Sequence, residues 1–328
     1  MNAKTFAVAP MMDWTDRHCR VFHRALTRAA TLYTEMVTAQ AVIHGDRQKL
    51  LGFDLVEHPV VLQLGGSDPK FLAEASKIGE GFGYDAINLN VGCPSDRVQG
   101  GHFGACLMAT PKLVAECFSA MQAAVNIPVT IKCRIGIDDM DEFQGLEDFV
   151  SEVAGAGCKS FIIHARKAWL KGLSPKENRE IPPLNYERVY QLKSSFHGLN
   201  IVLNGGLSSL KMDFSHISVL DGLMYGREAY HNPWMLIEVD PLFSGQTAPV
   251  ATRREAAETM FPYIERHLAT GAPLHHITRH MLGLYHAQAG GRMWRQILTM
   301  DGQKRGAGLE VIIRALTVVE EQAAKLAA

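Results

Sequence analysis

Over the first 227 residues of this 328-residue chain, eight short apolar runs alternate with segments of helical periodicity. The expected strands cover 6–11, 32–39, 60–66, 86–92, 129–136, 161–166, 201–206 and 223–227. Expected helices between them include 70–81, 111–125, 144–156 and 186–195. Near-continuous apolar strands joined by helices are typical of a parallel sheet buried on both faces. Eight such units in about 240 residues predict an α/β fold of the TIM (β/α)8 barrel type. A doubly wound open sheet is the alternative.

The pattern changes after Pro241, where strand signals stop and apolar residues follow helical spacing over 253–268, 274–289 and 309–326. We therefore expect a barrel domain over residues 1–242, a linker over 243–250 and a small all-α domain over 251–328. The chain carries a net charge of −1, but residues 251–328 hold ten Lys/Arg and seven Asp/Glu. This imbalance favours binding of a polyanion by the helical domain, although a solvated helical surface would explain it equally well.

The sequence argues against a membrane protein and against a secreted protein. No run of 18 apolar residues is present, which argues against a membrane span. Asp13 and Asp16 come too early for a signal peptide. The six cysteines form no CxxC pair and fit reduced thiols in the cytoplasm.

Polar residues interrupt the apolar runs where the strands end, which is where barrels carry their chemistry. They are Gln63, Asn88, Asn90, Lys132, Arg134, His164, Arg166, Asn204 and Arg227. Each would cost roughly 1–3 kcal/mol if buried without a partner. A shared polar ligand would satisfy many of them, so we expect one binding site at this end of the barrel.

Two glycine-rich turns, "NGGL" (204–207) and "YGRE" (225–228), follow the seventh and eighth strands. Barrels often hold a phosphate there, because glycine lets backbone N–H groups approach the oxygens; ordinary turn formation is the alternative. No P-loop or Rossmann glycine pattern appears, so we expect a mononucleotide cofactor. A cation pair of Lys132 and His164 would stabilise negative charge on its ring, unless the two belong to a structural hydrogen-bond network.

One cysteine stands apart from the other five. Cys93 follows the fourth strand between Gly92 and Pro94, whereas Cys19, Cys106, Cys117, Cys133 and Cys158 fit packing positions. A thiol is mostly protonated at neutral pH and can donate a proton. His276 and His280 lie four apart on an expected helix, but without a third ligand we expect basic helix surface and no metal site.

These segments together resemble the tRNA-dihydrouridine synthase family, in particular its bacterial A type, which acts on D-loop uridines 20 and 20a. The resemblance rests on "APMMDWTDRHCR", "EHPVVLQLGGSDP", "GYDAINLNVGCPSDRVQGGHFGACLM", "IKCRIGIDD", "IIHARKAWLKGLSPKENREIPPL", "VLNGG" and "MYGREAYHNPW". It implies an FMN-binding TIM barrel followed by a helical tRNA-binding domain, with NADPH as reductant.

The resemblance also assigns roles to individual residues. It implies that the flavin is lined by Pro10, Met11 and Met12, contacted at its ring by Gln63, Lys132 and His164, and held at its phosphate by Asn204, Gly205, Gly206, Gly226 and Arg227. Cys93 would be the catalytic acid. The implied tRNA contacts are Asn90, Lys176, Arg179, Arg292 and Arg295.

The expected reaction reduces the uracil C5=C6 bond, with hydride from reduced FMN reaching C6 and a proton from Cys93 reaching C5. We expect a monomer without an obligate protein partner. Three other functions remain open. They are a flavin barrel acting on a free pyrimidine, an RNA-binding protein without catalysis, and a flavin-free lyase that uses a Schiff base on Lys132.

Overall fold

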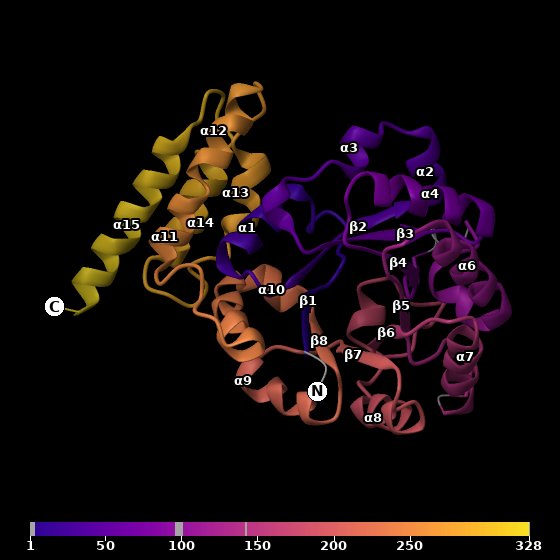
Figure 1. The fold of residues 1–328 in the computed structure, drawn as a ribbon. Coiled ribbons are helices and arrows are strands. Elements are labelled where there is room, and N and C mark those ends of the chain that lie inside the picture. Colours follow the sequence, from indigo (N-terminus) through magenta and orange to yellow (C-terminus); the bar gives the residue numbers. More distant parts are fainter. Residues whose placement is uncertain (1–3, 96–100, 142, 328) are drawn as a thin grey trace. The chain divides into compact units, whose positions relative to one another are not determined.

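The computed structural model describes residues 4–95, 101–141 and 143–327, and its eight parallel strands close into one barrel in sequence order (Figure 1). Each strand pairs with its neighbours in the chain, and β1 pairs with β8. The strands are β1 (Thr5–Val8), β2 (Thr31–Thr38), β3 (Val60–Gly65), β4 (Ala86–Val91), β5 (Val129–Arg134), β6 (Ser160–His164), β7 (Asn200–Asn204) and β8 (Gly222–Tyr225). The prediction of a TIM barrel is confirmed, and the open-sheet alternative is wrong.

Several strands end earlier than the apolar runs predict. The run 201–206 stops as a strand at Asn204, because Gly205 and Gly206 adopt φ values of 105° and 70°. Such positive φ values leave the β region and suit glycine. The glycines therefore begin a loop at the carboxyl end of β7.

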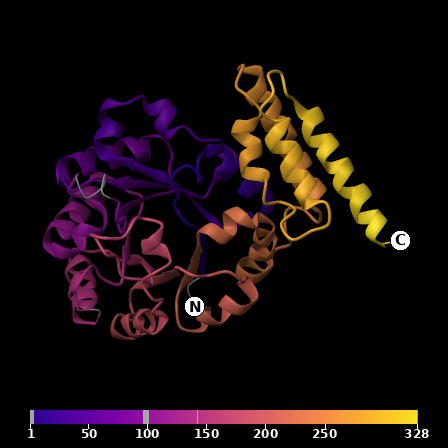
Figure 2. The same ribbon diagram turned by 180° about the vertical axis from the view of Figure 1, so that it is seen from behind.

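Small and medium apolar side chains fill the barrel interior. They are Ala7, Ala9, Tyr33, Val61, Ile162, Val202 and Met224. Helices surround the strands (Figure 2), and α4 shows how their start points are set. Pro69 occupies its first turn, and the Asp68 side chain accepts hydrogen bonds from the backbone N–H groups of Lys70 and Phe71.

The four helices expected around the barrel are present as α4 (Pro69–Gly81), α6 (Pro111–Ala124), α7 (Gln144–Gly155) and α8 (Tyr186–Ser195). Shorter helices accompany them: α2 (Ala39–His44), α3 (Arg47–Leu51), α9 (Leu210–Asp213) and the 3₁₀ turns η2 (Gly104–Ala109), η3 (Glu177–Arg179) and η4 (Phe214–Ser218).

Contacts divide the chain into two compact units, and the second is discontinuous in sequence. The first unit contains the strands and ends at Gly226, while the second combines 13–30, 54–57 and the chain from Arg227 onward. The second unit thus takes in α1 (Arg17–Leu26), which the sequence alone places with the barrel. The expected domain ranges 1–242 and 251–328, with a linker over 243–250, remain a prediction.

The helices of the second unit differ in part from those expected. They are α1, α10 (Arg227–His231), α11 (Arg253–Thr259), α12 (Phe261–Ala269), α13 (His275–Met281), α14 (Gly291–Met300) and α15 (Leu309–Ala327), with 3₁₀ turns η1 (Leu55–Glu57) and η5 (Pro233–Glu238). The single helix expected over 253–268 is broken, because Pro262 starts a new helix. The helix expected over 274–289 ends at Met281, and α14 was not predicted.

Asp240 shows why the segment before residue 245 is ordered. Its buried carboxylate accepts hydrogen bonds from the Thr27 hydroxyl at 2.6 Å and from the backbone N–H groups of Arg28 and Ala29 at 2.8 and 2.7 Å. Residues Asp240–Ser244 form one π-helical turn. In the described part of the chain, no helix has the length and apolar character needed to cross a membrane.

Candidate functional site

A ladder of polar side chains crosses β3, β4 and β5, from Thr130 near the start of β5 to Asn90 near the carboxyl end of β4. Gln63 donates to Asn88 at 2.8 Å, Asn88 donates to the Thr130 hydroxyl at 2.8 Å, and Asn90 donates to Gln63 at 2.9 Å. Gln63 and Asn88 are almost fully buried. Within the described residues these side chains therefore supply hydrogen-bond partners to one another, and a shared ligand for the strand-end groups stays a prediction.

The backbone of Cys93 is held from several sides. The Asn90 side-chain oxygen accepts hydrogen bonds from the N–H groups of Gly92 and Cys93, both at 3.0 Å. The Cys93 carbonyl accepts from the N–H of Ala105 at 2.9 Å. Cys93 itself is half-buried at the carboxyl end of β4. These bonds hold the backbone at Gly92 and Cys93, and Cys93 stays partly accessible.

Arg134 joins this cysteine loop to the loop after β6. Its guanidinium donates to the Gly92 carbonyl at 2.9 Å, to the Lys167 carbonyl at 3.0 Å and to the Asn178 carbonyl at 2.9 Å. The residue is 3% exposed, and burial lowers its pKa to about 10. The sequence marks Arg134 as a polar residue at a strand end but gives no sign of this cross-brace, because all three acceptors are backbone groups.

Lys132 and His164 differ in charge. Lys132 Nζ donates to the side-chain oxygen of Asn204 at 2.9 Å, and burial, followed by repulsion from Arg134, lowers the pKa of Lys132 to about 8. Burial lowers the pKa of His164 well below 6.5, and Arg134 and Lys132 lower it further. Without a bound ligand, these shifts favour a charged Lys132 and a neutral His164 at neutral pH, and their action as a cation pair on a bound ring stays a prediction.

The turn after β7 forms a cradle that only glycine can line. A Cβ on Gly205 would lie 2.5 Å from His164 Cδ2, and one on Gly206 would lie 2.3 Å from Leu184 Cδ1. The Tyr186 hydroxyl donates to the Gly205 carbonyl at 2.8 Å. Asn204, immediately before the turn, donates to the Met224 carbonyl of β8 at 2.7 Å and so ties β7 to β8.

The remaining flavin residues expected from sequence lie at the ends of β1 and β8. Pro10, Met11 and Met12 follow β1, and a Cβ on Gly226 would lie 3.7 Å from Met11 Sδ, which places these two strand ends side by side. Met12 is 56% exposed. Arg227 begins α10 in the second unit.

The four basic residues expected to contact tRNA are all exposed. Lys176 and Arg179 lie on the loop after β6, and Arg292 and Arg295 lie three residues apart on α14, so they share one face of that helix. Asn178, between the first pair, is fully buried and was not predicted.

The other five cysteines are buried or half-buried, and the two histidines singled out from the sequence differ in exposure. Cys19, Cys117, Cys133 and Cys158 are buried, Cys106 is half-buried, and all six cysteines are free. His280 is buried and contacts Asp16 at 3.0 Å. The expectation of basic helix surface is therefore wrong for His280, whereas His276 is exposed.

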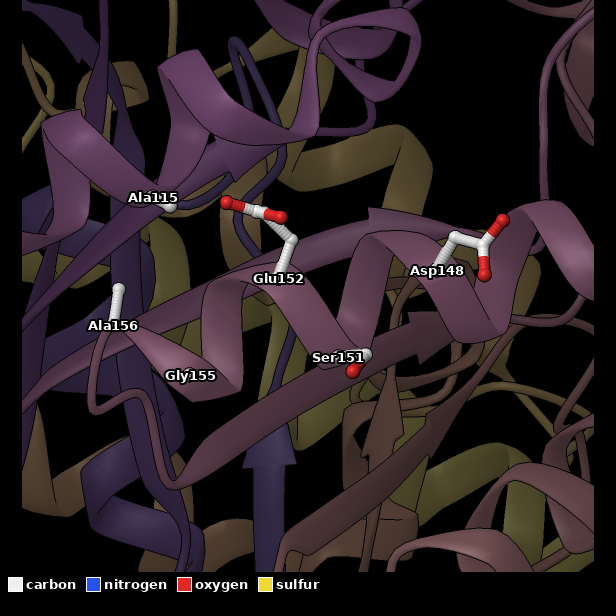
Figure 3. A pocket seen from close by; sticks show the side chains of 6 residues that line it. All are labelled: Ala115, Asp148, Ser151, Glu152, Gly155 and Ala156. Carbon is white, nitrogen blue, oxygen red and sulfur yellow. The ribbon is translucent and has the colours of Figure 1, made fainter.

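A groove between α6 and α7 lies on the outer side of the barrel (Figure 3). Its lining includes Ala115 from α6 and Asp148, Ser151 and Glu152 from α7. Both carboxylates belong to a helix surface, and the lining contains none of the strand-end residues described above, so this groove is not the candidate site.

Comparisons with known proteins place the chain in a family. A sequence model of the family described as "Dihydrouridine synthase (Dus)" matches residues 7–321. A protein of Xanthomonas campestris named tRNA-dihydrouridine(20/20a) synthase is 54% identical over 322 residues, covering 98% of this chain and 96% of its own. Proteins with the same name from Vibrio parahaemolyticus and Pasteurella multocida are 57% and 58% identical, and each alignment covers at least 96% of both chains.

Proposed function

The chain belongs to the dihydrouridine synthase family, and from this premise we propose that it reduces uridines in the tRNA D-loop, at positions 20 and 20a, to 5,6-dihydrouridine. The observation that carries the proposal is the anchored backbone of Gly92 and Cys93, which places Cys93 next to the β5 strand of Lys132 and Arg134 at one end of a barrel.

FMN is the cofactor that the residues fit. Gly205 and Gly206 have positive φ values, and a Cβ on either would strike a packed side chain, so the turn carries no side chains of its own. A turn of this kind suits the approach of backbone N–H groups to a phosphate. Lys132 on β5 provides positive charge, and its Nζ reaches the Asn204 side chain before the turn at 2.9 Å. In this proposal Asn204, Gly205, Gly206, Gly226 and Arg227 hold the phosphate. Gln63, Lys132 and His164 contact the ring, and Pro10, Met11 and Met12 line it.

Bound FMN, reduced by NADPH, supplies the hydride that reaches C6 of the uracil. The chain's own residues then have two tasks. The Cys93 thiol donates a proton to C5, which requires an approach of about 3 Å. Asn90 and Arg134 hold the loop so that this approach is reproducible, and the Lys132 cation stabilises developing negative charge.

The substrate of the proposed reaction is a uridine removed from its stack, at a cost of a few kcal/mol. Lys176, Arg179, Arg292 and Arg295 would offset this cost by binding tRNA phosphates, and Asn90 would lie near the base. The enzyme would act as a monomer in the cytoplasm, where its six free thiols remain reduced.

The test is turnover of tRNA that lacks dihydrouridine, read by mass spectrometry with FMN and NADPH present. Cys93→Ala should retain flavin and tRNA affinity but lose dihydrouridine formation by about 100-fold or more, since general acid catalysis contributes about 10²–10⁴-fold. Cys106→Ala is the matched control and should keep wild-type turnover. Full activity of Cys93→Ala would exclude the thiol as acid, and equal turnover of free uracil would favour the free-pyrimidine alternative.

A further inference from the structure

A tryptophan on the loop after β6 is both partly exposed and firmly held. We call residues 165–185 the β6 loop. Trp169 is 39% exposed within it, although tryptophan is highly buried on average. An exposed aromatic side chain on a functional loop suggests a contact with a ligand.

The backbone around Trp169 is fixed by a buried carboxamide. The Asn178 side-chain oxygen accepts from the Trp169 N–H at 2.8 Å, and its side-chain nitrogen donates to the Trp169 carbonyl at 2.9 Å. The preceding residue, Ala168, is buried and exchanges backbone hydrogen bonds with Gly136 and Asp138. The side chain of Asp138 accepts from the N–H that follows Trp169 at 2.8 Å. The backbone around Trp169 is therefore already ordered, and binding of a ligand to the indole would cost little further backbone entropy.

The same loop is basic. It contains five Lys/Arg and two Glu, and Lys171, Lys176 and Arg179 are exposed. Asn178 lies between Lys176 and Arg179 while it grips Trp169, so the aromatic ring and the cations belong to one rigid segment. Arg134 anchors this segment through the Asn178 carbonyl and also holds the cysteine loop. Within the described residues, no aromatic ring or guanidinium group stacks on Trp169.

We propose that Trp169 is a stacking platform for an unpaired base of the tRNA, distinct from the uridine that is reduced. The inference rests on the proposed function, since it takes tRNA as the partner. Surfaces that bind single-stranded nucleic acid combine cations for the phosphates with an aromatic face for a base. The β6 loop offers both, and its positive charge complements the phosphates of RNA.

The test compares Trp169→Ala and Trp169→Phe with wild type in tRNA binding over a series of salt concentrations. Trp169→Ala should weaken binding about 10-fold, as expected for loss of one stacked base, while Trp169→Phe stays within about 3-fold. The slope of log affinity against log salt should not change in either variant. Lys176→Ala should reduce that slope by about 0.7–0.9, because it removes one phosphate contact.

Intrinsic fluorescence gives a second measurement. Trp294 is fully buried, Trp14 stacks on Tyr230 at 4.5 Å, and Trp234 lies 4.6 Å from the Arg253 guanidinium. tRNA should therefore quench mainly Trp169, and Trp169→Phe should remove most of the quenching.

The outcomes separate this inference from the proposed function. The stacking platform is overturned if Trp169→Ala binds tRNA with wild-type affinity, or if the quenching survives in Trp169→Phe. In either case, tRNA binding by the wild type would still support the proposed substrate. A reduced salt slope in Trp169→Ala also overturns it, because the residue would then act only by ordering Lys176 and Arg179. A wild-type protein that does not bind tRNA overturns both.

Discussion

At the scale of single residues, the carboxamide of Asn90 combines two tasks. Its oxygen holds the N–H groups of Gly92 and Cys93, and its nitrogen joins the buried ladder through Gln63. A strand-end asparagine can be recognised as functional from sequence. Its hydrogen-bond partners cannot, because they depend on the register of β3 against β4. The same limit explains why the neutral state of His164 escaped prediction, since its low pKa results from burial.

Lys132 makes the ligand-free protein sensitive to pH. Its folded pKa of about 8 lies below the ordinary 10.5. Between these values the unfolded chain binds a proton that the folded protein does not, so the free energy of unfolding should rise with pH across this interval. Below pH 8 the buried charge costs about 3 kcal/mol at most.

Lys132→Met removes this charge and tests whether the charge makes stability rise with pH. The free energy of unfolding of the variant should exceed that of the wild type most below pH 8, and this excess should shrink toward pH 10.5. Denaturant unfolding of the flavin-free proteins at several pH values measures it. A difference in the free energy of unfolding that does not vary with pH would show that Lys132 has the same pKa in the folded and the unfolded protein.

At the scale of elements, strands were predicted better than helix ends. Continuous apolar runs located all eight strands because a barrel buries both faces of each strand. The C-terminal helices were harder, since Pro262 divides one of them and Trp294, on the unpredicted α14, is buried only through tertiary packing. The turn at Gly205 and Gly206 was anticipated from its glycines, whereas Tyr186, which supports it, lies on α8 and had no signal in the "NGG" motif.

Tyr186→Phe tests that support. Loss of the hydroxyl frees the Gly205 carbonyl, so the phosphate turn should lose order while the ring site does not. We expect FMN affinity of the flavin-free protein to fall about 5–10-fold, equivalent to one hydrogen bond of about 1 kcal/mol. Riboflavin, which lacks the phosphate, should bind within about 2-fold of wild type.

Flavin fluorescence titration measures both affinities. Tyr190→Phe is the matched control, because Tyr190 lies on the same helix but its hydroxyl contacts His216. An equal loss for FMN and riboflavin would place the effect of Tyr186 outside the phosphate turn.

At the scale of the whole molecule, the proposal assigns chemistry to the strand-containing unit and part of the tRNA affinity to the other. The double variant Arg292→Ala/Arg295→Ala should lower the slope of log affinity against log salt by about 1.4–1.8, because two phosphate contacts disappear. FMN content and oxidation of NADPH in the absence of tRNA should be unchanged.

The control for this prediction is Lys159→Ala, which removes an exposed charge before β6, at the opposite end of the strand from His164. Its salt slope should match that of the wild type. If the double variant also retains the wild-type slope, α14 does not contact the tRNA backbone.

The hydrogen bonds of Asp240 to residues 27–29 have a consequence for how the protein is made. An N-terminal helix, α1, belongs to a unit most of whose other residues, from Arg227 onward, leave the ribosome only near the end of translation. The nascent chain must therefore keep the apolar side of α1 uncovered while the strands emerge, a state that favours aggregation and chaperone binding. A C-terminally truncated product would inherit that exposure permanently, and its poor yield would not mean that the barrel itself is defective.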